Sequence, residues 1–284
     1  MKGMERQHII ETLAERYPQL TLPISAETRH GEEYKNTVLR GVKSERRADF
    51  GFSPDDRFER IETPAGSAEV LTISERADFE HCIRALAYRC EPAELPKTMG
   101  ASTISGLINW EKIRRHEEEY LAAGGDDWDE EFARFTSVRE NFRDTLIVLS
   151  RGPYSAVSAE RADYAEEKWL DLSLTIRKYH ELAHFVSRRL YPDNQDAVRD
   201  EVLADMNGVI AALGQFDAHL TGLFLGVENG EYIGGRLENY VPRGELSAAV
   251  ERVRKMLAVL DAEYSGASKP FEILTELESK KIFL

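Results

Sequence analysis

The sequence contains only two cysteines, Cys82 and Cys90, in 284 residues. Both lie in a segment that is expected to be a helix, where eight residues of separation correspond to about 12 Å of rise. This distance excludes a disulfide between the two side chains. We expect two buried free thiols, which suit a reducing compartment.

The chain also lacks a long apolar run. No hydrophobic stretch approaches the ~20 residues that span a bilayer, and residues 1–10 lack the uninterrupted apolar segment of a signal peptide. Charged residues make up 31% of the chain and hydrophobic residues 42%. We therefore expect a cytoplasmic protein with no membrane partner.

Basic residues are outnumbered by acidic ones. The chain has 37 lysines and arginines against 51 aspartates and glutamates, which gives a net charge of −14. Binding nucleic acid by general electrostatic attraction requires a basic face that displaces counterions from the phosphates. We expect no nucleic-acid partner, although a local basic patch is compatible with this composition.

Hydrophobic patterns predict the elements of the first half of the chain. Helical periodicity marks residues 5–17, 76–90 and 110–123. Extended structure is expected over residues 20–24, 34–40 and 143–150, and in a hairpin of residues 60–63 with 68–73. Residues 99–106 lack the Gly-Lys-Ser/Thr ending of a phosphate-binding loop and favour a packed turn.

These elements predict an α+β fold that is dominated by helices and has a small antiparallel or mixed sheet. We expect a mixed α/β N-terminal subdomain over residues 1–90 and a mainly helical region over residues 91–284. No repeat or long low-complexity linker separates them, so one compact domain is the alternative.

A metal-binding motif stands out in the second half. His180 and His184 are four residues apart in a predicted helix over residues 167–191, so both imidazoles can reach one metal ion at about 2.0–2.1 Å. Glu181 lies about 100° round the helix from His180, where its carboxylate can hold a proton of metal-bound water. The alternative is a pair of histidines packed beside the core.

A second predicted helix, over residues 196–213, carries two acids. Glu201 and Asp205 border its apolar face, where unpaired carboxylates are costly. A metal bound by Glu201, with Asp205 orienting the outer nitrogen of a ligand histidine, would satisfy both groups. A pair of solvated acids is the alternative. Because the turn at residues 191–194 is short, we expect this helix to pack antiparallel to the preceding one.

Together these motifs resemble the zincin metallopeptidases, and within them the gluzincin branch, whose pattern is H-E-x-x-H on one helix and E-x-x-x-D on a following helix. The resemblance implies a zincin-like domain with one zinc ion on the helix pair, held by His180, His184 and Glu201 with a water as fourth ligand. It also implies Glu181 as general base and Asp205 behind a ligand histidine.

The resemblance has clear limits within the superfamily. The sequence after His184 lacks the glycine and the third histidine of the metzincin branch, which is excluded. Sixteen residues separate His184 from Glu201, fewer than in thermolysin-like members, so the chain would be a divergent gluzincin. The similarity covers only residues 167–213.

Residues outside the motif are candidates for substrate contact. In zincins an edge strand before the motif helix often pairs with peptide, and residues 143–150 followed by Tyr154 could do the same; a plain core strand is the alternative. Donors for a developing oxyanion are sought downstream, with His219 ranked first. The other candidate donors are Tyr232, Tyr240 and Arg243. If Glu201 faces away, His219 or Asp217 is the replacement metal ligand.

The sequence therefore predicts a zinc-dependent hydrolase, a metallopeptidase that cleaves a peptide or amide bond in a peptide or protein substrate. Glu181 activates the water and His219 assists. The alternatives are a non-catalytic zinc-binding or helical interaction protein, and a zinc hydrolase of a non-peptide substrate. The sequence makes no prediction about the oligomeric state.

Overall fold

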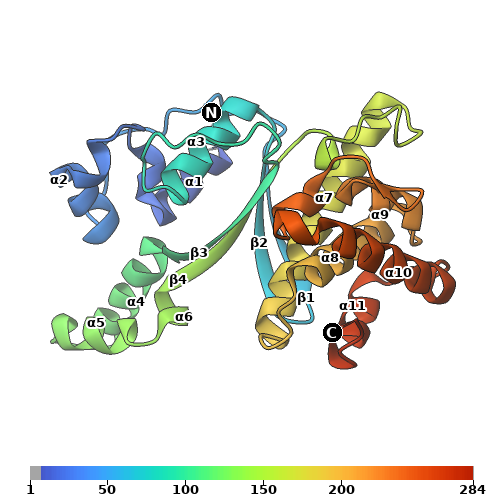
Figure 1. Ribbon diagram of the computed structural model, residues 1–284. Coiled ribbons are helices and arrows are strands. Elements are labelled where there is room, and N and C mark those ends of the chain that lie inside the picture. Colours follow the sequence, from blue (N-terminus) through green and yellow to red (C-terminus); the bar gives the residue numbers. More distant parts are fainter. Residues whose placement is uncertain (1–7, 284) are drawn as a thin grey trace, which may run out of the picture. The chain divides into compact units, whose positions relative to one another are not determined.

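The structure is a computed structural model that describes residues 8–283 (Figure 1). It is 54% helical and has a small mixed sheet of four strands, so the predicted α+β class is confirmed. Within the described residues, no helix combines the length and the apolar character needed to cross a bilayer. The prediction about a signal peptide falls largely on residues 1–7, which lie outside the described part.

The chain divides into two units. The first comprises the described residues up to Glu59, together with Glu69–Lys97 and Ser102–Val148. The second comprises Arg60–Ala68, Thr98–Ala101 and the described residues from Leu149 onward. The subdomain boundary that we predicted at residue 90 stays a prediction.

Several helical elements of the first unit contribute buried aliphatic and aromatic side chains to its core. The helical elements of this unit are α1 (Ile9–Arg16), η1 (Pro18–Thr21), η2 (Thr28–His30), α2 (Glu32–Tyr34), η3 (Lys35–Leu39), α3 (Arg76–Leu86), α4 (Trp110–Ala122), α5 (Trp128–Thr136) and α6 (Arg139–Phe142). Asn109 caps α4, because its side chain accepts a hydrogen bond from the backbone N–H of Lys112 at 3.1 Å. Cys82 and Cys90 are both free and buried, as predicted.

Four strands form one sheet in the order β1-β2-β4-β3. They are β1 (Arg57–Thr63), β2 (Gly66–Ile73), β3 (Ala101–Ile108) and β4 (Arg143–Ser150). The predicted hairpin and the predicted strand over residues 143–150 are confirmed. However, β4 has β2 on one side and β3 on the other, so the expectation that it is an edge strand able to pair with peptide is wrong.

Three local predictions in the first unit and its borders are also wrong. Residues 20–24 and 34–40 were expected to be extended, but η1, α2 and η3 occupy much of them. Pro18 begins η1, since its fixed φ suits the first position of a helical turn. The packed turn expected over residues 99–106 is largely strand β3, because its backbone groups pair within the sheet.

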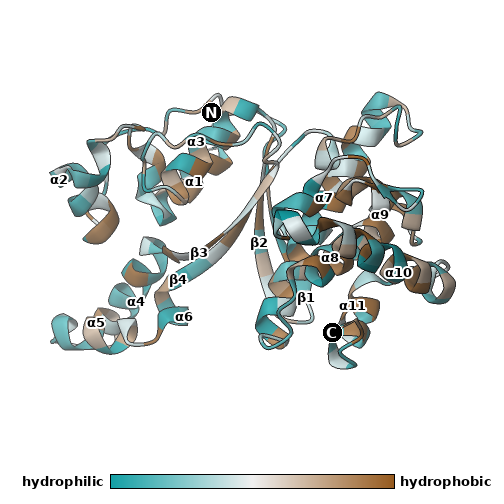
Figure 2. Ribbon diagram, viewed as in Figure 1, coloured by the Kyte–Doolittle hydropathy of each residue, from teal (hydrophilic) through white to brown (hydrophobic). Residues whose placement is uncertain are grey.

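The second unit is built from long helices. They are α7 (Glu166–Leu190), α8 (Ala197–Leu213), α9 (Ala218–Leu225), α10 (Leu246–Tyr264) and α11 (Pro270–Ser279), with the short elements η4 (Tyr154–Ala156), β5 (Val227–Glu228), β6 (Glu231–Tyr232), η5 (Arg236–Asn239) and η6 (Arg243–Glu245). The helices predicted over residues 167–191 and 196–213 are confirmed to within one residue at each end. Figure 2 shows hydrophobic and hydrophilic residues alternating along α10, whose buried face includes Val253 and Leu260.

A glycine allows α7 and α8 to approach closely. A Cβ atom added to Gly208 of α8 would lie 2.5 Å from the carbonyl oxygen of Ile176 in α7, which is far closer than real Cβ contacts. The two helices run antiparallel, because His180 contacts Asp205 whereas His184, one turn later, contacts Glu201. Polar side chains on the facing surfaces are therefore brought within ligand distance of one another.

Candidate metal centre

Three side chains on α7 and α8 form a cluster with the spacing of metal ligands. One potential ligand atom each of His180, His184 and Glu201 lies within 4.8 Å of the others. The two Nε2 atoms are 3.1 Å apart, Nε2 of His184 is 3.2 Å from Oε1 of Glu201, and Nε2 of His180 is 3.5 Å from Oε2 of Glu201. Ligands at about 2.0–2.1 Å from a tetrahedral zinc ion are roughly 3.3–3.4 Å apart. These separations between potential ligand atoms are close to the spacing that zinc requires.

Burial makes this donor set unusual. His180 is 5% exposed, and His184 and Glu201 are each 9% exposed. Two imidazole nitrogens that face each other out of water need a proton or a metal ion between them, since two lone pairs repel. A buried set of two imidazoles and one carboxylate is also the ligand chemistry that zinc prefers.

Asp205 fixes the orientation of the first histidine. Its Oδ1 lies 2.9 Å from Nδ1 of His180, and it also accepts a hydrogen bond from the hydroxyl of Tyr154 at 2.6 Å. Because an ionised carboxylate only accepts hydrogen bonds, the proton of the neutral imidazole is on Nδ1. In the neutral ring, Nε2 of His180 is therefore the nitrogen without a proton, and it faces His184 and Glu201.

Arg236 of η5 connects the two acids. Its Nη2 donates to Oδ2 of Asp205 at 2.5 Å, and its Nη1 donates to Oε2 of Glu201 at 3.3 Å. Two glycines allow Arg236 to reach the helix pair. A Cβ added to Gly235 would lie 2.5 Å from Cα of Gly226, so the two backbone segments can approach this closely only because neither residue has a side chain. Arg236 is not among the site residues predicted from the sequence, although the nearby glycines indicate a tight turn.

Tyr154 lies at the site because a side chain of α7 bonds to the backbone of the loop that carries this tyrosine. Arg177 donates to the carbonyl of Ser150 at 2.8 Å and to that of Pro153 at 3.1 Å. The guanidinium groups of Arg177 and Arg236 lie 5.7 Å and 5.1 Å from the centre of the Tyr154 ring. The loop after β4 therefore supplies a buried hydroxyl to Asp205, a contact that the sequence did not predict.

Opposite charges in the cluster shift one another's pKa values toward the ionised forms. Burial opposes ionisation of Glu201, but His184, His180 and Arg236 outweigh it and hold the pKa of this carboxyl far below its usual range. Burial likewise opposes ionisation of Asp205, and Arg236 and His180 still keep its pKa below normal. Burial lowers the pKa of His184, but the hydrogen bond and charge of Glu201 raise it above its ordinary value.

Glu181 follows the first histidine in α7 and is half-buried. Its charge adds to the rise in the pKa of His184, which indicates that the carboxylate lies within electrostatic range of the cluster. Glu181 itself is not among the three potential ligands. This placement is compatible with a role beside the metal ion and not on it.

A pocket of about 510 Å³ begins at the cluster, within the second unit. His184 contributes to its wall, and the rest comes from the end of α7 and the start of α8. Its polar lining includes Ser187, Arg188, Asn194 and Asp200. The volume lies within the range of small-molecule and peptide side-chain sites, so one candidate ligand is accessible from a cleft.

Comparison with known protein families places the chain in one of them. A family model described as "Family of unknown function (DUF7005)" matches residues 2–269. The chain belongs to this family. Comparison with curated proteins found no match, and neither did comparison with solved structures. The DUF7005 match contains α7, α8 and Arg236, whereas α11 lies beyond it.

The other predicted site residues of this DUF7005 protein are placed differently. His219 is exposed at the second position of α9 and is not part of the cluster. Asp217 accepts a hydrogen bond from the backbone N–H of Leu220 and thereby caps α9. Glu201 faces the histidines, so neither residue is needed as a replacement ligand. The catalytic role assigned to His219 stays a prediction.

The remaining candidate donors differ in their position relative to the cluster. The hydroxyl of Tyr232 bonds within its own turn, to the carbonyl of Gly235 at 2.8 Å, and Arg243 is exposed. Tyr240 is beside the centre: burial raises the pKa of its hydroxyl, the charge of Arg236 opposes the rise, and the Glu201 carboxylate adds to it. Of the four candidates named from the sequence, Tyr240 is the one that interacts with a potential metal ligand.

Proposed function

We propose that this member of the DUF7005 family is a zinc-dependent hydrolase that cleaves a peptide or related amide bond, as its resemblance to gluzincin metallopeptidases implies. One observation carries the proposal: His180, His184 and Glu201 are buried together, with their Nε2 atoms 3.1 Å apart and the two carboxylate oxygens of Glu201 at 3.2 Å and 3.5 Å from them, close to the ligand spacing around tetrahedral zinc.

These three residues would hold the ion, and Asp205 supports the set by keeping Nε2 of His180 free of its proton. Bound zinc would act as a Lewis acid toward a substrate carbonyl and lower the pKa of a water molecule. Asp205 is itself held by Tyr154 and Arg236, so the orientation of His180 does not depend on solvent.

Glu181 is the general base of the proposed reaction. It accepts the proton of the attacking water and passes it to the leaving amine. Tyr240 replaces His219 as the favoured donor to the oxygen of the polarised carbonyl, since its hydroxyl is beside Glu201. The pocket beside His184 receives the part of the substrate next to the scissile bond.

A specific observation also favours a second candidate. Arg236 pairs with both Glu201 and Asp205, so the acids are compensated by a cation of the chain itself. A non-catalytic protein could use the same network to hold α8 and η5 together. The two candidates differ in zinc content and in turnover.

The first test is the zinc content of the purified full chain by elemental analysis. We expect about one zinc per chain in the wild type and a large loss in His184→Ala and in Glu201→Ala. His219→Ala is the matched control, because this histidine is exposed and outside the cluster, and it should keep its zinc. A wild-type protein that takes up no zinc under zinc-replete conditions refutes the proposal.

The second test separates catalysis from metal binding. Glu181→Gln should keep its zinc and lose cleavage of a peptide library by about 10²–10⁴-fold. A zinc-loaded wild type that cleaves no peptide or amide, with Glu181→Gln indistinguishable from it, favours the non-catalytic candidate.

A further inference from the structure

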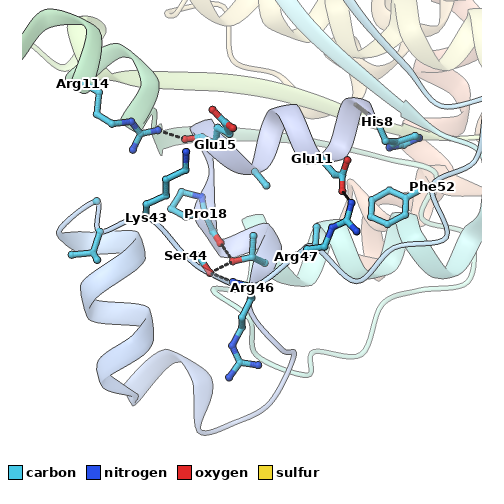
Figure 3. A pocket seen from close by; sticks show the side chains of 15 residues that line it. His8, Glu11, Glu15, Pro18, Lys43, Ser44, Arg46, Arg47, Phe52 and Arg114 are labelled. Carbon is cyan, nitrogen blue, oxygen red and sulfur yellow. Dashed lines mark hydrogen bonds and ion pairs between the residues drawn. The ribbon is translucent and has the colours of Figure 1, made fainter. Parts of the chain in front are cut away.

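The first unit contains a pocket that the proposed hydrolase does not use. It has a volume of about 960 Å³ and lies between α1, η1, the chain from Gly41 to Phe52, and Arg114 of α4 (Figure 3). This volume is at the upper end of the range for small-molecule sites. All of its lining residues belong to the first unit.

The lining of the pocket is basic, against the trend of the chain. Four cationic side chains line it, namely Lys43, Arg46, Arg47 and Arg114, against the two carboxylates of Glu11 and Glu15. The whole chain carries a net charge of −14. Glu33 also pairs with Arg46 at 2.6 Å, so the four cations exceed the neighbouring carboxylates by one, and this local excess of positive charge raises the concentration of anions at the pocket.

The cations keep donors available for a ligand. Lys43 is exposed and forms no ion pair with any residue between 8 and 283. Arg47 pairs with Glu11 at 2.8 Å, and Arg114 donates to the backbone carbonyl of Glu15 at 2.6 Å. Each guanidinium has five N–H donors, so these single contacts leave several of them unused. Exposed ion pairs are also weak enough to exchange partners.

The arrangement of the cations fits a dianion. In Figure 3 the side chains of Lys43 and Arg114 point toward one another beside Glu15, whereas Arg47 lies with Glu11 near Phe52. Two cations that converge on one place match a phosphoryl group, which carries a charge of about −1.5 to −2 at pH 7.

An aromatic side chain lies at the other end of the pocket. Phe52 packs edge-on against the ring of His8, with centroids 5.0 Å apart. Its φ of 53° is rare for a residue with a side chain, and such a conformation persists only where the surroundings enforce it. A fixed phenyl ring next to a cation offers a surface on which a planar ring can stack.

We propose that this pocket binds a phosphorylated small molecule of the mononucleotide class, with its phosphate between Lys43 and Arg114 and its planar ring against Phe52. The inference is independent of the zinc centre, because no residue of the centre lines the pocket. It assigns a ligand site to the first unit, which has no role in the proposed hydrolytic reaction.

Calorimetric titration of the full chain with AMP, adenosine and citrate tests this proposal. We expect AMP to bind with a dissociation constant in the millimolar range or tighter, more weakly as salt is raised. Lys43→Glu should weaken AMP binding about tenfold or more, and it should fold normally because Lys43 is exposed. Arg114→Gln removes the other cation at the phosphate and gives a second, independent loss of affinity, and Arg115→Gln, on the exposed face of α4 outside the pocket, is the matched control.

Several results overturn the proposal. They are the absence of AMP binding, adenosine or citrate binding as tightly as AMP, and equal AMP affinities for the wild type and Lys43→Glu. A loss of AMP affinity in Arg115→Gln as large as that in Lys43→Glu is also contrary, since it would indicate general attraction and not this pocket.

Discussion

Oδ1 of Asp205 lies 2.9 Å from Nδ1 of His180, and this contact connects the two halves of the motif that the sequence carries on separate helices. It keeps the proton on Nδ1 and leaves Nε2 available to a metal ion. Asp205 can do this at 0% exposure because Tyr154 and Arg236 satisfy its remaining lone pairs.

Replacing this carboxylate should weaken zinc binding without removing a ligand. We expect Asp205→Asn to lower zinc affinity about 10–100-fold, because the amide cannot hold His180 in one tautomer with the strength of a carboxylate. Competition with a chromogenic chelator measures the change. Asp261→Asn, an exposed acid of α10, should bind zinc like the wild type; equal affinities for all three proteins would contradict the role given to Asp205.

Arg236 should contribute most to the stability of the fold when zinc is absent. Arg236→Gln leaves the buried carboxylates of Glu201 and Asp205 without their cationic partner, and removal of one member of such a pair costs about 3–5 kcal/mol. Bound zinc compensates part of the same negative charge, so the loss should be smaller in the zinc-loaded protein.

Urea unfolding with zinc and with a chelator measures this difference for Arg236→Gln. Arg254→Gln, whose ion pair with Glu251 is exposed on α10, is the control and should leave the free energy of unfolding close to that of the wild type. If Arg236→Gln lowered the free energy of unfolding equally with and without zinc, the stabilising role of Arg236 would be unrelated to zinc binding.

The close approach of α7 and α8 should be sensitive to one methyl group. In Gly208→Ala the new Cβ meets the carbonyl oxygen of Ile176 at 2.5 Å, so the helices must move apart. We expect a loss of about 1–3 kcal/mol in the free energy of unfolding and weaker zinc binding, because the ligands lie on both helices. Gly266→Ala, which meets nothing within 4 Å, is the control; unchanged zinc affinity in Gly208→Ala would show that the centre tolerates helix displacement.

Zinc binding should depend on pH through His184. Its pKa is raised above the ordinary 6.5 because Glu201 outweighs the effect of burial. The protonated imidazole therefore stabilises the metal-free fold fully below pH 6.5, and this contribution is lost as the pH rises through the raised pKa. Zinc needs the unprotonated ring, so its affinity should increase over the same window.

Chelator competition at a series of pH values from 6 upward measures this increase, and calorimetry should register the release of roughly one proton on binding. The acids act in the opposite direction: the pKa values of Glu201 and Asp205 are lowered, so their contribution is present above about pH 4.5 and is lost as the pH falls further. Zinc affinity that is flat above pH 6 would contradict the assignment of His184.

Some elements of the fold follow from local sequence and others do not. The helices that carry His180 and Glu201 were predictable, because apolar residues recur at helical spacing over several turns and the Asp196 cap and Gly214 terminus bound α8. Residues 34–40 were predicted as extended, but they are helical because Trp110 packs against Gly41 and donates to the carbonyl of Val38. Local propensity contains no information about a partner 72 residues away.

Some features of the candidate metal centre also follow from local sequence, and others do not. The sequence by itself determined that His180 and His184 share a helix face and that Glu201 and Asp205 share another, because spacing along a helix fixes direction. Only the tertiary structure decided that Arg236, Tyr154 and Tyr240 complete the site and that β4 is internal to its sheet. Those relationships depend on contacts between segments distant along the chain, which neither periodicity nor spacing encodes.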